Sequence, residues 1–122
     1  LLTWDTENLL DGAIWCGHYH KDVASDMALK FIDNYHTIYG TEGDPNDIVA
    51  LNYDSVYILK LAIEKAQSLE RENIHNAFGE IGTYEGVTGT MTWDNGNGDP
   101  TKSAVVIQIS GGQFKYLDTV NP

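Results

Sequence analysis

The sequence predicts an α/β protein, and three features carry that prediction. A long apolar helix is expected over residues 44–68, a short apolar strand precedes it at residues 13–16, and a glycine-rich β-ribbon follows from Gly79 onward. Helix-type and strand-type spacing therefore occur in one chain of 122 residues, a length that suits a single domain. We expect a three-layer arrangement, or part of one, with helices around a small mixed sheet.

The composition excludes several classes of partner and site. Eighteen acidic residues against seven basic ones give a net charge of -11, so nucleic acid or an anionic membrane would be repelled. The single cysteine, Cys16, excludes an internal disulfide and a multi-cysteine metal site. Its apolar neighbours predict a buried packing residue and not a nucleophile. No signal peptide is recognisable, and any targeting segment would lie upstream of Leu1.

The first twenty residues contain the first candidate site. Residues 1–10 are expected to form the end of a strand, a polar turn and a short helical piece. The continuous apolar run Ala13–Cys16 is typical of a strand buried on both faces, and residues 17–20 leave it as a loop. Open α/β sheets bind ligands at the carboxyl ends of their strands. This rule selects four candidate ligand-binding residues: Trp4, Asp5, His18 and Tyr19.

Each candidate has an alternative interpretation. The Trp4 indole offers a flat apolar wall and the Asp5 carboxylate a partner for an ammonium group, but the pair also fits a helix cap with a packing tryptophan. His18 and His20 alternate, so in an extended segment both rings would face one way and could share a metal, while Tyr19 would face the opposite side and line the cleft. A metal needs at least three protein ligands, and no third is recognisable. We therefore predict surface or hinge histidines and no metal site.

Two further helices are expected on either side of the central one. Residues 25–39 carry one apolar stripe, with Ser25 as a cap and Gly40 at a left-handed end. A third, shorter helix should cover residues 71–78.

The central helix has the clearest start signal. Asp44 is expected to cap it and Pro45 to occupy its first position. Apolar side chains occupy most of its circumference, so we expect other layers to cover it on most sides. It is not a membrane span, because polar residues interrupt the apolar run. Asp54 is one of them, and is either an acid of perturbed pKa or a carboxylate that bonds a neighbouring loop. We favour the loop, since no histidine or second acid lies near it in the sequence.

The last third of the chain is expected to form a β-ribbon. Residues 90–93 alternate like a half-buried strand, and residues 94–100 form a turn cluster that lacks the ligand pattern of a calcium loop. Residues 103–110 and 113–118 flank Gly111-Gly112, which predicts a tight antiparallel hairpin.

Four stretches, in this order and spacing, resemble one known family. They are TWDTENLL, KFIDNYHTIYG, YDSVYILKLAIEKAQS and the tail that begins FGEIGTYEGVTGTMTWDNGNGDPTKSA. Together they are similar to the carboxyl-terminal part of the periplasmic binding proteins of the branched-chain amino acid (Leu/Ile/Val) type, the solute receptors of ABC importers. The resemblance implies part of a periplasmic-binding-protein type I fold, Rossmann-like and three-layered. Two lobes of this fold close on an amino acid.

The resemblance also implies a division of the chain. Residues of about 1–20 and 103–122 would belong to the second lobe, and residues of about 21–102 to the first. Complete members are much longer, so the chain is expected to be a fragment that needs a missing amino-terminal portion or associates with itself. Leu1 and Leu2 stand where the family has a glycine and the acid that meets the ligand's ammonium group, and Asp5 is the acid available to replace it.

The implied function is binding without chemistry. The resemblance implies the substrate-binding component of an ABC importer, periplasmic or extracellular, with a membrane permease as partner, no cofactor and no catalytic residue. On its own the chain should bind a solute weakly, because half of the cleft lies elsewhere. The alternative is a ligand-sensing or protein-interaction domain of a receptor with the same fold. A small hydrolase using Asp5 or Asp54 with a histidine is the weaker reading, because no nucleophile motif supports it.

Overall fold

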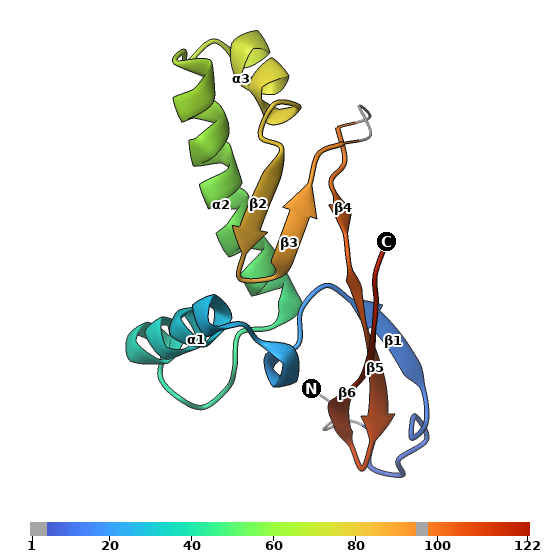
Figure 1. Cartoon of the computed structure of the whole chain (residues 1–122). Helices are drawn as coiled ribbons and strands as arrows, with labels where there is room; N and C mark the ends of the chain where they lie inside the picture. The colour runs from blue at the N-terminus through green and yellow to red at the C-terminus, as the bar shows by residue number, and fades with distance from the viewer. Residues whose placement is uncertain (1–4, 95–97) are drawn as a thin grey trace.

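The computed structural model describes residues 5–94 and 98–122, and it confirms the α/β class. Figure 1 shows helix α2 standing beside a β-hairpin, with α1 lying across its foot and a second group of strands below. The elements in chain order are β1 (Ile14–Gly17), the 3-10 turn η1 (Lys21–Val23), α1 (Asp26–Tyr39), α2 (Asp47–Ala66), α3 (Arg71–Phe78), β2 (Thr83–Gly86), β3 (Gly89–Thr92), β4 (Thr101–Lys102), β5 (Ala104–Ser110) and β6 (Gln113–Val120).

The strands within the described residues form two separate three-stranded sheets, in the orders β1-β5-β6 and β2-β3-β4. Every pairing among the described strands is antiparallel, where a mixed sheet was expected. The predicted hairpin is confirmed: β5 and β6 flank Gly111 and Gly112, both at positive φ. Ser103 lies between β4 and β5, so the chain passes there from one sheet to the other.

Strand β1 differs from its prediction. Among the described strands it lies at the edge of its sheet and pairs with β5 alone, and the side chains of Ile14 and Trp15 are 63% and 60% exposed. Cys16 is exposed as well. The prediction of a strand buried on both faces, with a buried cysteine, is therefore wrong. The apolar run is typical of a strand that other layers cover, but the described residues supply no layer over β1.

The segment before β1 consists of turns. Backbone bonds run from Asn8 N to the Asp5 carbonyl and from Asp11 N to the Asn8 carbonyl, and Gly12 N donates to the Ile109 carbonyl on β5. The expected short helical piece is absent from residues 5–13. The end of this segment is instead hydrogen-bonded to β5, the central strand of the sheet.

Helices α1 and α3 follow their predictions closely. The Ser25 hydroxyl accepts from Ala28 N at 3.2 Å, and Gly40 ends α1 at a φ of 85°. Helix α3 covers residues 71–78 as expected.

Helix α2 begins later than predicted, and the expected cap at Asp44 is wrong. The Asn46 side chain caps it, accepting from Val49 N at 3.0 Å, and Asp47 is its first residue. The Asp44 carboxylate is engaged elsewhere, at 2.6 Å from Lys21 Nζ and 3.1 Å from His36 Nε2. It therefore ties the loop before α2 to η1 and α1.

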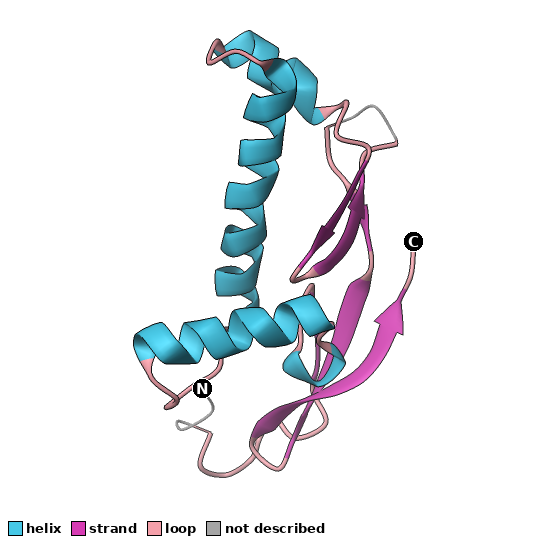
Figure 2. Ribbon diagram, turned by 60° about the vertical axis from the view of Figure 1, so that its left-hand side comes forward, coloured by secondary structure: helices cyan, strands magenta, loops and turns pink. Residues whose placement is uncertain are grey.

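Most of the surface of α2 is open to solvent. Its buried residues form one stripe at intervals of four, consisting of Ala50, Asp54, Ile58 and Ala62. Apolar side chains elsewhere on the helix are exposed, among them Ile48, Tyr53, Val56, Tyr57, Leu59 and Leu61. The expectation of cover on most sides is wrong for this chain, because the described residues supply a hairpin along one face, α1 at the foot and α3 at the far end, but no further layer (Figure 2).

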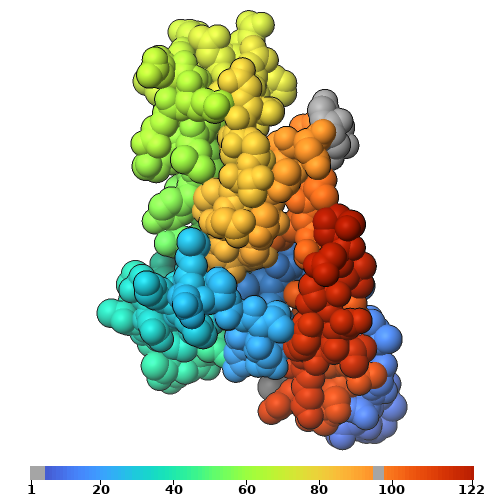
Figure 3. Space-filling model, viewed as in Figure 1, coloured from blue at the N-terminus to red at the C-terminus, as the bar shows by residue number. Residues whose placement is uncertain are grey.

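The core lies where the segments meet in the middle of the molecule. Its buried side chains come from the loop after β1, from α1, from α2 and from the tip of the β2–β3 hairpin: Tyr19, Ala28, Phe31, Ile32, Ala50 and Val87. Figure 3 shows the atoms around η1 and α1 abutting both the hairpin and the β5–β6 ribbon. Within residues 5–94 and 98–122, none of the helices combines the length and apolar character that crossing a bilayer requires.

Candidate functional site

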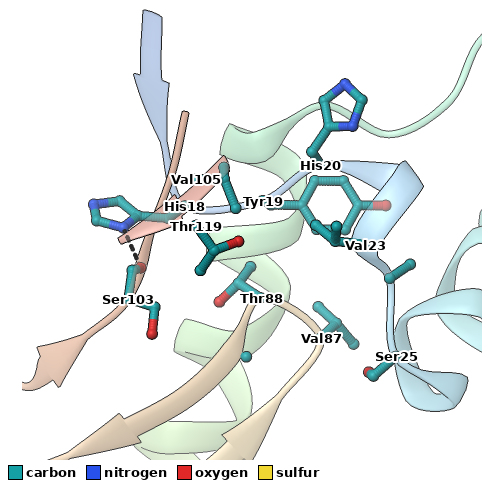
Figure 4. A pocket seen from close by; sticks show the side chains of 12 residues that line it. His18, Tyr19, His20, Val23, Ser25, Val87, Thr88, Ser103, Val105 and Thr119 are labelled. Carbon is teal, nitrogen blue, oxygen red and sulfur yellow. Dashed lines mark hydrogen bonds between the residues drawn. The ribbon is translucent and has the colours of Figure 1, made fainter. Parts of the chain in front are cut away.

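A cavity of about 170 Å³ lies at the junction of the two sheets (Figure 4). It is smaller than the roughly 300 Å³ at which ligand pockets usually begin, so it suits a very small solute or one part of a larger ligand. Its lining comes from the loop after β1, from the start of α1, from the hairpin tip and from the second sheet: His18, Tyr19, His20, Val23, Ala24, Ser25, Val87, Thr88, Gly89, Ser103, Val105 and Thr119.

Tyr19 supplies one wall of the cavity. Its side chain belongs to the core and is 7% exposed, and its buried hydroxyl has no hydrogen-bond partner among the described residues. Burial raises the pKa of Tyr19 to about 12, because the phenolate would lose its hydration, and the nearby Asp44 carboxylate adds to the effect. The phenol therefore stays neutral at alkaline pH values at which an ordinary tyrosine ionises.

The two histidines do not act as a pair. His18 Nδ1 lies 3.4 Å from the Ser103 carbonyl, while His20 Nδ1 accepts from Asp22 N at 3.3 Å and caps η1. The prediction that both rings face one way is wrong, because the cap turns His20 away, and Figure 4 shows the rings well apart. Across the described parts of the chain, no three His, Cys, Asp or Glu side chains are grouped to hold a metal ion.

Asp5 lies away from the cavity lining. Its carboxylate is buried and accepts from Leu9 N at 2.8 Å and from Leu10 N at 3.1 Å. This matches the alternative reading of a backbone cap, here on a turn and not on a helix. Trp4 lies outside the described residues. Of the four predicted ligand-binding residues, the structure brings His18 and Tyr19 together at the cavity; a ligand role for Asp5 stays a prediction.

Asp54 bonds a neighbouring loop, which confirms the favoured reading of this acid. Its carboxylate is fully buried, and Oδ1 accepts from Val87 N at 2.9 Å and from the Tyr84 hydroxyl at 3.3 Å. Oδ2 accepts from the amide and the hydroxyl of Thr88, at 2.9 and 2.6 Å. Burial, assisted by the Asp54 charge, raises the pKa of Tyr84 to about 12.

The hairpin tip is the part of the site that the sequence did not single out. Val87 and Thr88 both line the cavity, and glycines stand on either side of them at positions 86 and 89. A glycine-flanked pair between two short strands predicts a tight turn, but it does not reveal what the turn touches. The turn contacts Asp54, the buried acid in α2, and nothing in the sequence indicates that these two features lie together.

Lys102 joins the tip to the strand that crosses between the sheets. Its Nζ donates to the Thr88 carbonyl, and burial lowers the pKa of Lys102, an effect that the Asp54 charge opposes. The site thus consists of apolar walls with a few fixed polar groups. Such a surface can hold a small solute through apolar contact and a small number of hydrogen bonds.

Comparisons with known proteins agree with this architecture. A family model described as periplasmic binding protein matches residues 5–113, whereas no curated protein matches the chain. The leucine binding protein LivK of Thermotoga maritima is 34% identical, with a TM-score of 0.80 over 93% of this chain and 32% of that one. The branched-chain amino acid transporter substrate binding protein LivJ of Streptococcus pneumoniae, solved with isoleucine, is 24% identical, with a TM-score of 0.76 over 89% of this chain and 30% of that one.

A more distant structure shows the same fold. A solute binding protein of an ABC transporter from R. palustris, solved with benzoate, is 16% identical, with a TM-score of 0.72 over 93% of this chain and 31% of that one. The chain therefore spans about a third of the length of the structures it matches. Since the family model covers most of the sequence, the chain belongs to the periplasmic binding protein family.

Proposed function

We propose that this chain is part of the extracytoplasmic substrate-binding component of an ABC importer. The whole protein would capture a branched-chain amino acid or a similar small organic solute without chemistry and deliver it to a membrane permease. The observation that carries the proposal is the 34% identity to a leucine binding protein over 93% of the chain.

The arrangement of the two sheets supports a division between two lobes. Sheet β1-β5-β6 is built from the residues assigned to the second lobe, about 1–20 and 103–122. Sheet β2-β3-β4 and the helices come from residues of about 21–102. The chain passes between these groups in the loop after β1 and again at Ser103, and the cavity lies beside both passages. A cleft between lobes that move about such passages can close on its ligand.

Within this proposal, His18 and Tyr19 are the ligand-site residues that the chain contributes. Both lie on the first passage and line the cavity. Trp4 and Asp5 are proposed as site residues from the strand-end rule and the resemblance.

A chimera provides the test. This chain would replace the matching third of the T. maritima leucine binding protein, and calorimetry would measure binding of leucine, isoleucine, valine, phenylalanine and benzoate. We expect at least one of these solutes to bind with a Kd in the micromolar range or below. The unmodified leucine binding protein is the control for folding and for leucine. A folded chimera that binds none of the five solutes would overturn the proposal.

The isolated chain is the second arm of that experiment. Because its cavity of about 170 Å³ is small for an amino acid pocket, we expect no binding tighter than about millimolar. Micromolar binding by the chain alone would show that the cleft does not need the other two thirds.

A further inference from the structure

A single carboxylate joins the hairpin tip, residues 86–89, to helix α2. Asp54 accepts hydrogen bonds from both central amides of the tip and from the Thr88 hydroxyl. Buried N–H groups without an acceptor are strongly unfavourable, so the tip depends on Asp54 to occupy this position.

The residue opposite the carboxylate is shaped to admit it. A Cβ atom on Gly86 would lie 2.5 Å from Asp54 Oδ2 and 2.6 Å from its Cγ, closer than real Cβ contacts occur. The φ of Gly86 lies outside the left-handed region, so the backbone conformation does not call for glycine here. The space taken by the carboxylate accounts for the missing side chain.

The tip in turn bears on the cavity and on both passages between the sheets. Val87 and Thr88 line the cavity, and Val87 shares the core with Tyr19 (Figure 4). The Thr88 carbonyl accepts from Lys102, whose neighbour Ser103 begins the second passage. The Ser103 carbonyl lies 3.4 Å from His18 Nδ1 on the first passage. Hydrogen bonds therefore link Asp54 to the tip and the tip to Lys102. The chain continues to Ser103, whose carbonyl contacts His18, so the two passages are linked to α2.

We propose that Asp54 is a positioning residue of this cavity: it contacts no ligand, but it fixes the hairpin tip as the wall that shares the core with Tyr19 and places Lys102 beside the second passage. What the cavity binds rests on the proposed function. The position of the wall does not, so it is testable without any ligand.

The first test is amide hydrogen exchange on the chain carrying Asp54→Asn. The amide side chain keeps the shape of the carboxylate, but its NH2 group cannot accept from the tip. We expect exchange at Val87 or Thr88 to accelerate by about tenfold or more, while the amides of β5 and β6 keep their rates. Asp33→Asn, at an exposed position on α1, is the matched control and should change neither set. Uniform acceleration throughout the chain, or no change at the tip, would overturn the proposal.

A variant that keeps Asp54 makes the proposal falsifiable if Asp54→Asn fails to fold. Thr88→Val removes one hydroxyl and leaves both amide bonds, so it loosens the tip mildly. Water should then reach the neighbouring phenol, and the pKa of Tyr19 should fall from about 12 toward its ordinary value of 10.0. An unchanged Tyr19 titration in Thr88→Val contradicts a wall held by this contact.

A double-mutant cycle supplies the last measurement. Gly86→Ala should accelerate exchange at the tip when Asp54 is present and have little effect in an Asp54→Ala background, because the clash is then gone. Additive effects of the two substitutions would overturn the assigned contact. All of these measurements are made without solute, so they stand or fall separately from the amino-acid binding proposed above.

Discussion

Two tyrosines lie beside carboxylates in this acidic protein, the buried Tyr19 near Asp44 and the half-buried Tyr84 near Asp54. In both, burial is the larger cause of a pKa raised to about 12, and the neighbouring negative charge adds to it. The folded protein therefore holds these phenols neutral at a pH where an unfolded chain would ionise them. Stability and tyrosine ionisation are thus linked at alkaline pH.

The sign of that linkage gives the first prediction. Below the ordinary tyrosine pKa of 10.0, folded and unfolded chains bind the same phenolic protons; between pH 10 and 12 the unfolded chain loses them first. The contribution of these two tyrosines to stability should therefore be constant up to about pH 10 and fall as the pH rises toward 12. Urea unfolding across this range tests it, together with ultraviolet titration of tyrosinate.

Single substitutions distinguish the ionisation of Tyr19 and Tyr84 from that of an exposed tyrosine. Tyr19→Phe and Tyr84→Phe should each remove one late-ionising group, whereas Tyr39→Phe, at a residue 72% exposed, should remove none. If all seven tyrosines ionise together near pH 10, the raised pKa values of Tyr19 and Tyr84 are incorrect.

Local sequence signals predicted well which helices and strands form, but they predicted poorly how far these elements are buried. Ser25 and Gly40 mark the ends of α1, residues 71–78 form α3, and Gly111-Gly112 turns the β5–β6 hairpin, because caps and turns are decided by neighbours in sequence. The prediction that residues 13–16 are buried was wrong, because burial depends on covering layers that the run itself does not encode.

The candidate site divides along the same line. His18 and Tyr19 were found from their place after a strand, although that strand is antiparallel to its neighbour and not parallel as the rule assumes. The wall formed by Val87 and Thr88 was missed. Their contacts with Asp54 span 33 and 34 positions of sequence, a separation at which no periodic pattern signals proximity.

The turn between β5 and β6 gives a prediction about stability. Gly111 has a φ of 60° and open space around its Cα, so an alanine there would suffer backbone strain without a clash. We expect Gly111→Ala to lower the free energy of unfolding by about 1 kcal/mol and Gly111→Asn by clearly less, since asparagine tolerates positive φ.

Chemical denaturation measures both changes. Gly43→Ala is the matched control, because Gly43 also has open space but not a positive φ. It should be neutral or slightly stabilising. Equal losses in Gly111→Ala and Gly43→Ala would argue against the left-handed turn.

At the scale of the whole molecule, apolar surface without cover dominates. The exposed side chains of β1 and α2 include Ile14, Trp15, Val56 and Leu59. A soluble monomer rarely presents so many apolar groups, and an unpaired strand edge adds hydrogen-bonding groups to them. The chain matches only about a third of its structural relatives, which gives these surfaces a ready explanation in the proposed two-lobed parent.

Self-association of the isolated chain is the resulting prediction. Light scattering should show the mean mass rising with concentration, and Val56→Lys should reduce that rise by placing a charge on the apolar surface of α2. Ser55→Lys adds the same charge at an exposed polar position of the same helix and should have a smaller effect. A chain that stays monomeric at every concentration would contradict an adhesive surface.

The central claim is that the chain supplies parts of two lobes and both passages between them. Small-angle X-ray scattering of the chimera with the T. maritima leucine binding protein, with and without leucine, tests this most directly. We expect a smaller radius of gyration when leucine is bound, because the lobes would close about the passages at residues 18–20 and at Ser103. Leucine binding by a folded chimera whose radius of gyration does not change would contradict it.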